Sequence, residues 1–263
     1  MPEAPLRPVV LSIAGHDPTG GAGIQADIEA IASQGCHAAT VVTALTVQDT
    51  RDVQAVIPIA PASIAEQCRT LMADLVIRAI KLGLIPSVEI AQTVAALLDE
   101  LPGVPVVLDP VLASGAGTPL SDQALRRSLR ESLLPRTTLL TPNSREARQL
   151  AEQEDLDDCG RTLLALGCAA VLITGAHESG PRVVNRLYLP DGRIDSVDWE
   201  RLPGSYHGSG CTLAASIAAL LARGLELGQA VHQAQGYTWN SLRHAFQPGR
   251  GQALPNRFYR QIP

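Results

Sequence analysis

Positive charge is scarce in this chain of 263 residues, which has 21 Lys and Arg against 26 Asp and Glu and a net charge of −5. A basic stripe, the usual footprint of a nucleic-acid-binding protein, is absent, so no nucleic-acid partner is expected. No apolar run reaches membrane-spanning length, because Gly, Pro and charged residues interrupt every candidate. The opening MPEAPLRPVV, with an early acid and several prolines, does not resemble a secretory signal. These absences favour a cytoplasmic protein that has no membrane partner.

Paired cysteine motifs are also missing. The five cysteines are irregularly spaced and include no C-x-x-C, which fits a reducing cytosol better than a disulfide framework or a zinc site. Four of them are expected to act as small buried hydrophobic residues. Only Cys211 lies in a setting that would change its chemistry.

Lysine occurs once, at Lys81, against twenty arginines. Nucleotide composition bias explains the imbalance, but the one lysine lies in the apolar stretch at residues 79–83. We expect a compact ammonium to be needed there, in a place where a planar guanidinium would not fit.

Short apolar runs alternate with amphipathic helical stretches along the chain. Strands are predicted at residues 9–14, 38–45, 77–82, 105–108, 138–140 and 170–173, and a hairpin at 183–189 and 193–198 around Asp191-Gly192. Helices are predicted at residues 24–34, 63–75, 88–100, 122–134, after Asn143, and at 160–166, 211–223 and 227–246, the second beginning with a capping box of Ser63 and Glu66. This order predicts an α/β fold with a mostly parallel central sheet, helices on both faces and one antiparallel hairpin. No linker or repeat divides residues 1–263, which are expected to form a single domain.

Ligands of such sheets bind at the carboxyl ends of the strands, so the loops there hold the candidate site residues. The first loop, GHDPTGGAG at residues 15–23, places Asp17 among four glycines. Its spacing fits neither a dinucleotide-binding motif nor a Walker loop. Free backbone amides at a helix N-terminus favour a binding loop over a flexible connection.

Polar residues follow three further strands. The side-chain amide of Gln48 can form hydrogen bonds with a donor and an acceptor of a heterocycle at once. Taken alone, Gln48 is better interpreted as an ordinary surface glutamine. Asp109 suits an Mg²⁺-bound water or a phosphate, or it merely ends its strand. Asn143 and Glu146 have the spacing of a helix cap, which by itself explains both residues. In the functional alternative, Glu146 holds a metal-bound water and Asn143 faces a nucleotide phosphate.

The stretch HGSGC at residues 207–211 opens a helix of small residues. Gly208, Ser209 and Gly210 let successive N–H groups converge, and the helix dipole adds positive potential that suits a transferring phosphoryl group. Cys211 on that first turn is expected to have a lowered pKa and to accept the proton of a substrate hydroxyl. The structural alternative is a small residue packed under the loop.

Six segments of the chain resemble, in order, the bacterial hydroxymethylpyrimidine/phosphomethylpyrimidine kinases of the ribokinase-like superfamily: AGHDPTGGAGIQAD, TALTVQDT, IKLGL, VLDPVLASGAG, TPNSREA and HGSGCT. The resemblance runs from about residue 9 to residue 246. It implies a three-layer ribokinase-like fold, ATP and Mg²⁺ as cofactors, and a homodimer. The implied reaction is phosphorylation of 4-amino-5-hydroxymethyl-2-methylpyrimidine, and of its monophosphate to the pyrophosphate, in thiamine biosynthesis.

The resemblance also implies roles for individual residues. Pyrimidine binding is implied for Gly15, Asp17, Ala22, Thr46, Gln48 and Leu84, the last in place of a frequent methionine. Metal organisation is implied for Asp109 and Glu146, nucleotide binding for Asn143, Thr174 and His207, and the anion hole with its base for Gly208, Ser209, Gly210 and Cys211. Thr174 is a departure, because family members often carry a phosphate-binding lysine there. Either Mg²⁺ or an arginine compensates for the missing charge, or phosphoryl transfer is slower.

Two other functions stay open. A pyridoxal or pyridoxine kinase would share the fold and the anion hole, but its pyridine ring lacks the exocyclic amine that Gln48 would bind. A non-catalytic pyrimidine-binding sensor is suggested by Thr174, although both carboxylates and the anion hole are retained.

Overall fold

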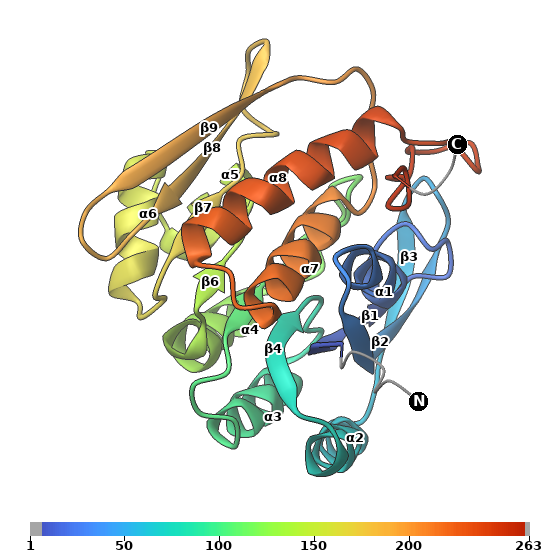
Figure 1. The fold of residues 1–263 in the computed structure, drawn as a ribbon, viewed down its shortest axis with the longest axis vertical. Helices are drawn as coiled ribbons and strands as arrows, with labels where there is room; N and C mark the ends of the chain where they lie inside the picture. The colour runs from blue at the N-terminus through green and yellow to red at the C-terminus, as the bar shows by residue number, and fades with distance from the viewer. Residues whose placement is uncertain (1–6, 261–263) are drawn as a thin grey trace, which may run out of the picture.

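The computed structural model describes residues 7–260, which contain a nine-stranded sheet with the order β3-β2-β1-β4-β5-β6-β7-β8-β9 (Figure 1). The six strands in the middle of this order, β2, β1, β4, β5, β6 and β7, run parallel. At the two edges, β3 pairs antiparallel with β2, and β8 and β9 continue the sheet beyond β7 as antiparallel strands. The bounds are β1 Val9–His16, β2 His37–Gln48, β3 Val53–Pro58, β4 Ile77–Leu82, β5 Val106–Leu108, β6 Leu139–Leu140, β7 Val171–Ile173, β8 Arg182–Tyr188 and β9 Ile194–Glu200. The predicted mostly parallel sheet and the hairpin at its end are confirmed.

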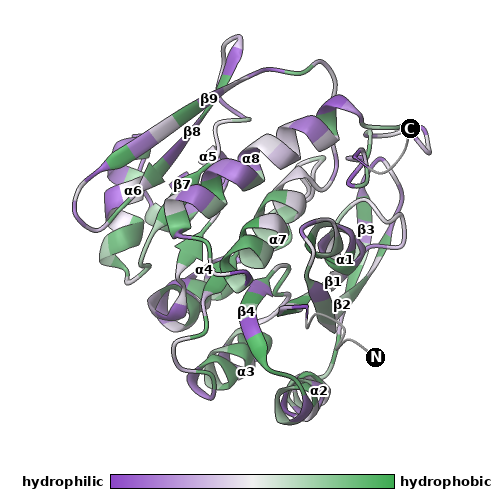
Figure 2. Ribbon diagram, viewed as in Figure 1, coloured by the Kyte–Doolittle hydropathy of each residue, from purple (hydrophilic) through white to green (hydrophobic). Residues whose placement is uncertain are grey.

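Helices cover both faces of the sheet and make three layers (Figure 1). One face carries α1 (Gly23–Ser33), α7 (Ser209–Ala222) and α8 (Leu227–Arg243), and the other carries α2 (Pro61–Asp74), α3 (Val88–Asp99), α4 (Gln123–Ser128), α5 (Ser144–Ala151) and α6 (Leu156–Ala165). Successive strand side chains point to opposite faces, so Val10 joins one apolar cluster while Leu11 and Ile13 join the other. Hydrophobic residues predominate along α7, which is buried over most of its length (Figure 2). Within the described residues, no helix has the length and apolar character needed to cross a membrane.

The second strand differs from its prediction. β2 continues to Gln48 and pairs with β3, a strand that the sequence analysis missed. Thr46 and Gln48 therefore lie on an antiparallel ribbon at the edge of the sheet, not in a loop. The strand β3 reads VQAVIP, with a polar Gln54 inside it and Pro58 at its end, and its residues are half-buried or exposed, as is typical of an edge strand.

Two helices also differ. α2 begins at Pro61, where a missing N–H costs nothing, and Ala60 is its N-cap, so the predicted capping box of Ser63 and Glu66 is wrong. The predicted helix at residues 122–134 is capped by the Asp122 side chain as α4, but continues as a π-helix, η1 (Leu129–Leu133), and a 3₁₀ turn, η2 (Leu134–Arg136).

Candidate active site

The loop between β1 and α1, residues 15–23 (the glycine loop), is organised by Asp17. Its Oδ1 accepts hydrogen bonds from the backbone N and the Oγ1 of Thr19, both at 2.8 Å, and its Oδ2 accepts from the N of Ala22 at 2.7 Å. Gly23 has φ +59°, and a Cβ there would lie 2.2 Å from the carbonyl oxygen of Gly15. The loop is therefore a tight turn that only glycine permits at Gly23.

His207 joins the glycine loop to the segment before α7. Its Nε2 lies 2.8 Å from Oδ2 of Asp17. Burial opposes ionisation of that carboxyl, but the contacts with His207 and Thr19 outweigh it and lower the pKa of Asp17. The structure thus places His207 beside Asp17, a residue of the implied pyrimidine group. The nucleotide role implied for His207 stays a prediction.

The first turn of α7 meets both the glycine loop and Asp109. Gly208 is the N-cap with φ +83°, and a Cβ on it would lie 1.8 Å from the carbonyl oxygen of Gly21. A Cβ on Gly210 would lie 3.6 Å from Oδ1 of Asp109. The first N–H groups of a helix have no partner within the helix, so the first turn of α7 can bind an anion between the glycine loop and Asp109.

Cys211 lies on that turn with 9% of its surface exposed. Burial raises the pKa of its thiol, and the nearby Lys81 ammonium only partly offsets this. The predicted lowering of the pKa is therefore wrong, because desolvation and the carboxylates of Asp109 and Asp27 outweigh the favourable charges. Burial also raises the pKa of the Asp109 carboxyl, and the Lys81 ammonium and the neighbouring Cys211 thiol only partly offset this.

Lys81 lies beneath this turn with no exposed surface. Its Nζ is 2.9 Å from Oδ2 of Asp27, which also accepts a hydrogen bond from Ser12 Oγ at 2.6 Å. Burial disfavours the ammonium, but the Asp27 carboxylate, with a smaller effect of Asp109, outweighs it and raises the pKa of Lys81. A Cβ on Gly83 would lie 2.7 Å from Nζ, so the ammonium lies directly against this glycine. The need for a compact ammonium at position 81 stays a prediction.

Asp109 and Glu146 form a pair of buried carboxyl groups, 5% and 8% exposed. Burial, and next the charge of Asp109, raise the pKa of Glu146 to about 8. No group of three or more His, Cys, Asp or Glu side chains in residues 7–260 is arranged to hold a metal ion. Two repelling carboxylates nevertheless fit Mg²⁺, which commonly takes one or two carboxylates and completes its shell with water and phosphate oxygens.

Asn143 and Glu146 form the capping box that their spacing predicts. Asn143 Oδ1 accepts from the N of Arg145 and of Glu146, both at 3.0 Å, and Glu146 Oε2 accepts from the N of Asn143 at 2.9 Å. The N of Thr174 donates to the carbonyl of Pro142 at 2.9 Å, which places Thr174 beside this helix start. The cap is confirmed, and a nucleotide role for Asn143 and Thr174 stays a prediction.

The residues implied in pyrimidine binding gather at the carboxyl ends of β1, β2 and β4. A Cβ on Gly15 would lie 3.0 Å from Leu84 Cδ2, so these two positions touch. Gln48 Nε2 donates to Thr46 Oγ1 at 2.8 Å, and Thr46 Oγ1 donates to the carbonyl of His16 at 2.9 Å. Gln48 is half-buried and held by one end, which leaves its carbonyl oxygen available.

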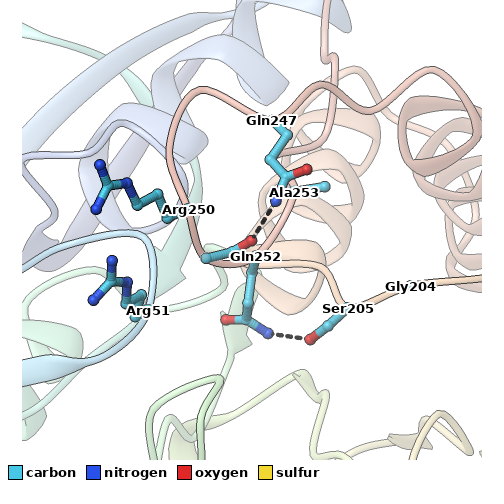
Figure 3. Close-up of a pocket in the computed structure, with 8 residues that line it drawn as sticks. Arg51, Gly204, Ser205, Gln247, Arg250, Gln252 and Ala253 are labelled. Carbon is cyan, nitrogen blue, oxygen red and sulfur yellow. Dashed lines mark hydrogen bonds between the residues drawn. The ribbon is translucent and has the colours of Figure 1, made fainter.

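Sequence reasoning missed the contribution of residues 246–257, the C-terminal segment. Its middle part lines a cavity of about 420 Å³ together with the β2–β3 turn and the approach to α7 (Figure 3). Arg257 of this segment contacts both the glycine loop and α7. Nothing in the sequence distinguished this arginine from the nineteen others.

The comparisons with known proteins identify a family. The family model described as phosphomethylpyrimidine kinase matches residues 17–256. The hydroxymethylpyrimidine/phosphomethylpyrimidine kinase of Synechococcus elongatus is 40% identical over 258 residues, which are 96% of this chain and 98% of that protein. The Escherichia coli protein of the same name is 37% identical over 242 residues, 89% and 91% of the two chains.

Solved structures with two different names share the fold. The pyridoxal kinase of Bacillus subtilis, in an ADP complex, has a TM-score of 0.89 and 29% identity, over 98% of this chain and 100% of that chain. The phosphomethylpyrimidine kinase of Clostridium difficile has a TM-score of 0.78 and 31% identity, over 89% and 99%. The fold alone does not separate these activities, so the sequence relatives carry the assignment. On the family match and these identities, the chain belongs to the phosphomethylpyrimidine kinase family.

Proposed function

We propose that this protein uses ATP to phosphorylate a hydroxymethylpyrimidine, and then phosphorylates the monophosphate to the pyrophosphate. The observation that carries the proposal is the first turn of α7, which touches the glycine loop through Gly208 and faces Asp109 through Gly210. The turn thereby joins an anion-binding helix start to a binding loop and to a carboxylate pair. Phosphoryl transfer depends mainly on such positioning and charge stabilisation.

Each group has a defined task in this proposal. The free N–H groups at residues 209–211 stabilise the charge of the transferring phosphoryl group. Asp109 and Glu146 would hold Mg²⁺, which neutralises phosphate charge when bound. The thiol of Cys211, whose pKa is raised by burial, shapes the anion hole by packing within the turn and does not serve as the base. Gln48 binds the amino and ring-nitrogen edge of the pyrimidine, and the hydroxyl of Thr174 donates to a nucleotide phosphate.

The second candidate is a pyridoxal kinase, favoured by the TM-score of 0.89 with the Bacillus subtilis enzyme. A coupled assay of ATP consumption with hydroxymethylpyrimidine, its monophosphate, pyridoxal and ribose separates the two. We expect turnover with the first two and a much lower kcat/KM with pyridoxal. A preference for pyridoxal would overturn the proposal, and pyrimidine binding without ATP consumption would indicate a sensor.

The Gln48→Leu variant tests pyrimidine recognition within the same assay. It should lower kcat/KM for the pyrimidine by about 10–100-fold, because the exocyclic amine loses its partner, and should leave pyridoxal turnover nearly unchanged. Gln54→Leu, at an exposed position of the partner strand β3, is the control. We also expect a homodimer of single-domain subunits, which light scattering during size-exclusion chromatography measures.

A further inference from the structure

The chain returns to the active site after α8. In the C-terminal segment the N of Ala253 donates to the carbonyl of Ser205 at 3.0 Å, and the N of His207 donates to the carbonyl of Ala253 at 2.9 Å. Gln252 Nε2 also donates to Ser205 Oγ at 2.6 Å, as Figure 3 shows. The segment therefore lies along the approach to the anion hole and pairs with it.

Arg257, near the end of this segment, is 3% exposed and uses all three guanidinium nitrogens. Its Nε donates to Thr212 Oγ1 at 2.9 Å, and its Nη2 donates to the carbonyl of Gly21. Its Nη1 donates to the carbonyl of Gly20 at 3.3 Å and to Glu29 Oε2 at 3.0 Å. One buried side chain thus bridges the glycine loop, α1 and the first turn of α7.

Thr212 connects the Arg257 side chain to Gly208 of the anion hole by hydrogen bonds. Its hydroxyl donates its single hydrogen to the carbonyl of Gly208 at 2.8 Å, so it accepts the hydrogen bond from Arg257. The Cα of Gly208 in turn packs against the carbonyl of Gly21 so closely that a Cβ would lie 1.8 Å from that oxygen. Arg257 therefore braces the place where the two loops touch, and it supplies donors to the buried carbonyl of Gly21 and the part-buried carbonyl of Gly20.

The backbone of Arg257 is anchored independently of its side chain. Its carbonyl accepts hydrogen bonds from Ser33 Oγ of α1 and Tyr237 Oη of α8, each at 2.8 Å. A guanidinium held in this way presents a rigid fork of donors, whereas a lysine ammonium reaches one acceptor region at a time.

We propose that Arg257 is a positioning residue that holds the glycine loop (residues 15–23) against the anion hole (residues 208–211). The inference rests on the kinase function proposed above, and it adds a residue outside the stretch 17–256 that the family model matches. Catalysis then depends on the C-terminal segment as well as on the loops that follow the strands. A small displacement between binding loop and anion hole is enough to lower the rate by about 100-fold.

The test compares Arg257→Met, Arg257→Lys and the control Arg260→Met in the full chain. Arg260 is exposed and lies over the Tyr237 and Tyr259 rings, three positions further along. Steady-state kcat and KM with the pyrimidine and ATP are measured beside hydrogen–deuterium exchange of peptides covering residues 17–23 and 206–212. We expect Arg257→Met to lose about 100-fold in kcat with a smaller change in KM. Exchange should rise in both peptides, but not in the central strands.

Arg257→Lys keeps the charge but not the fork, so it should fall near Arg257→Met and far from wild type. A folded Arg257→Met variant with kcat within threefold of wild type and unchanged exchange would overturn the proposal. If Arg257→Met does not fold, Arg257→Lys decides by the same criteria. If wild type shows no pyrimidine kinase activity, the proposed function fails, whereas the exchange data still support or refute the brace.

Discussion

The buried pair of Lys81 and Asp27 gives the sharpest prediction, which is the effect of Lys81→Met. The two groups are 2.9 Å apart, and neither side chain is exposed. The pKa of Lys81 is raised, since its negative neighbours outweigh burial, so it is charged at every pH at which the protein would be assayed. Replacing it with a methionine of similar length leaves the Asp27 carboxylate buried with Ser12 as its donor.

The expected loss in the free energy of unfolding comes from the buried Asp27 carboxylate, which no longer has a positively charged partner. Removing one partner of a buried ion pair costs about 3–5 kcal/mol, a large part of the roughly 5–15 kcal/mol by which domains are stable. Removing both charges is much less costly, because no uncompensated ion remains. The double variant Lys81→Met/Asp27→Asn should therefore be more stable than Lys81→Met.

Urea unfolding followed by circular dichroism measures both effects, and the two single variants with the double variant complete a thermodynamic cycle. Arg69→Met is the control, because Arg69 and Glu100 form a 2.6 Å pair on the surface, 57% and 38% exposed, whose loss should barely move the midpoint. A loss of less than about 1 kcal/mol for Lys81→Met, or a double variant no more stable than it, would refute the reasoning. Lys81→Arg should also lose activity, and full activity would show that the compact ammonium is dispensable.

Three further predictions follow from the glycine loop and the first turn of α7. Gly208→Ala should abolish activity, because the added Cβ would collide with the carbonyl oxygen of Gly21. The control is Gly224→Ala, which has a similar φ of +87° but no atom within 4 Å of the added Cβ, so it should cost only backbone strain. Steady-state kinetics and thermal melts of both variants measure the difference. Cys211→Ala should lose less than the roughly 100-fold that removal of a general base costs, because the thiol is protonated; a larger loss in kcat would restore the base role. Asp17 has a lowered pKa, so its contribution to stability is complete above the unfolded value of about 3.9 and is lost as the pH falls through the lower folded value. Urea midpoints below about pH 4 should therefore fall more steeply for wild type than for Asp17→Asn, and parallel curves would contradict this.

Local patterns predicted the central part of the fold. Strands buried on both faces appear as continuous apolar runs, so β1 and β4 were found within two residues of their ends. The Asp191-Gly192 turn marked the β8–β9 hairpin, and the spacing of Asn143 and Glu146 marked the start of α5. Each of these signals lies within a few neighbouring residues.

Features that depend on distant contacts were missed. β3 is an edge strand with little burial, and its pairing with β2 is visible only in three dimensions. The pKa of Cys211 is raised by burial and by the charges of Asp109 and Asp27, which together outweigh the Lys81 ammonium and the helix-start position that suggested a thiolate. The partner of Lys81 lies 54 positions away on α1, and no sequence spacing indicates it.

The bridge between Arg257 and Gly20 joins positions 237 apart in the chain. At a synthesis rate of about 5–20 residues per second, the ribosome makes the loop roughly 10–50 s before the arginine that completes its hydrogen bonds. A nascent chain can therefore form the sheet while the carbonyls of the glycine loop still form hydrogen bonds with water. Competence for phosphoryl transfer is expected to arise late and abruptly during translation, when the guanidinium reaches its acceptors.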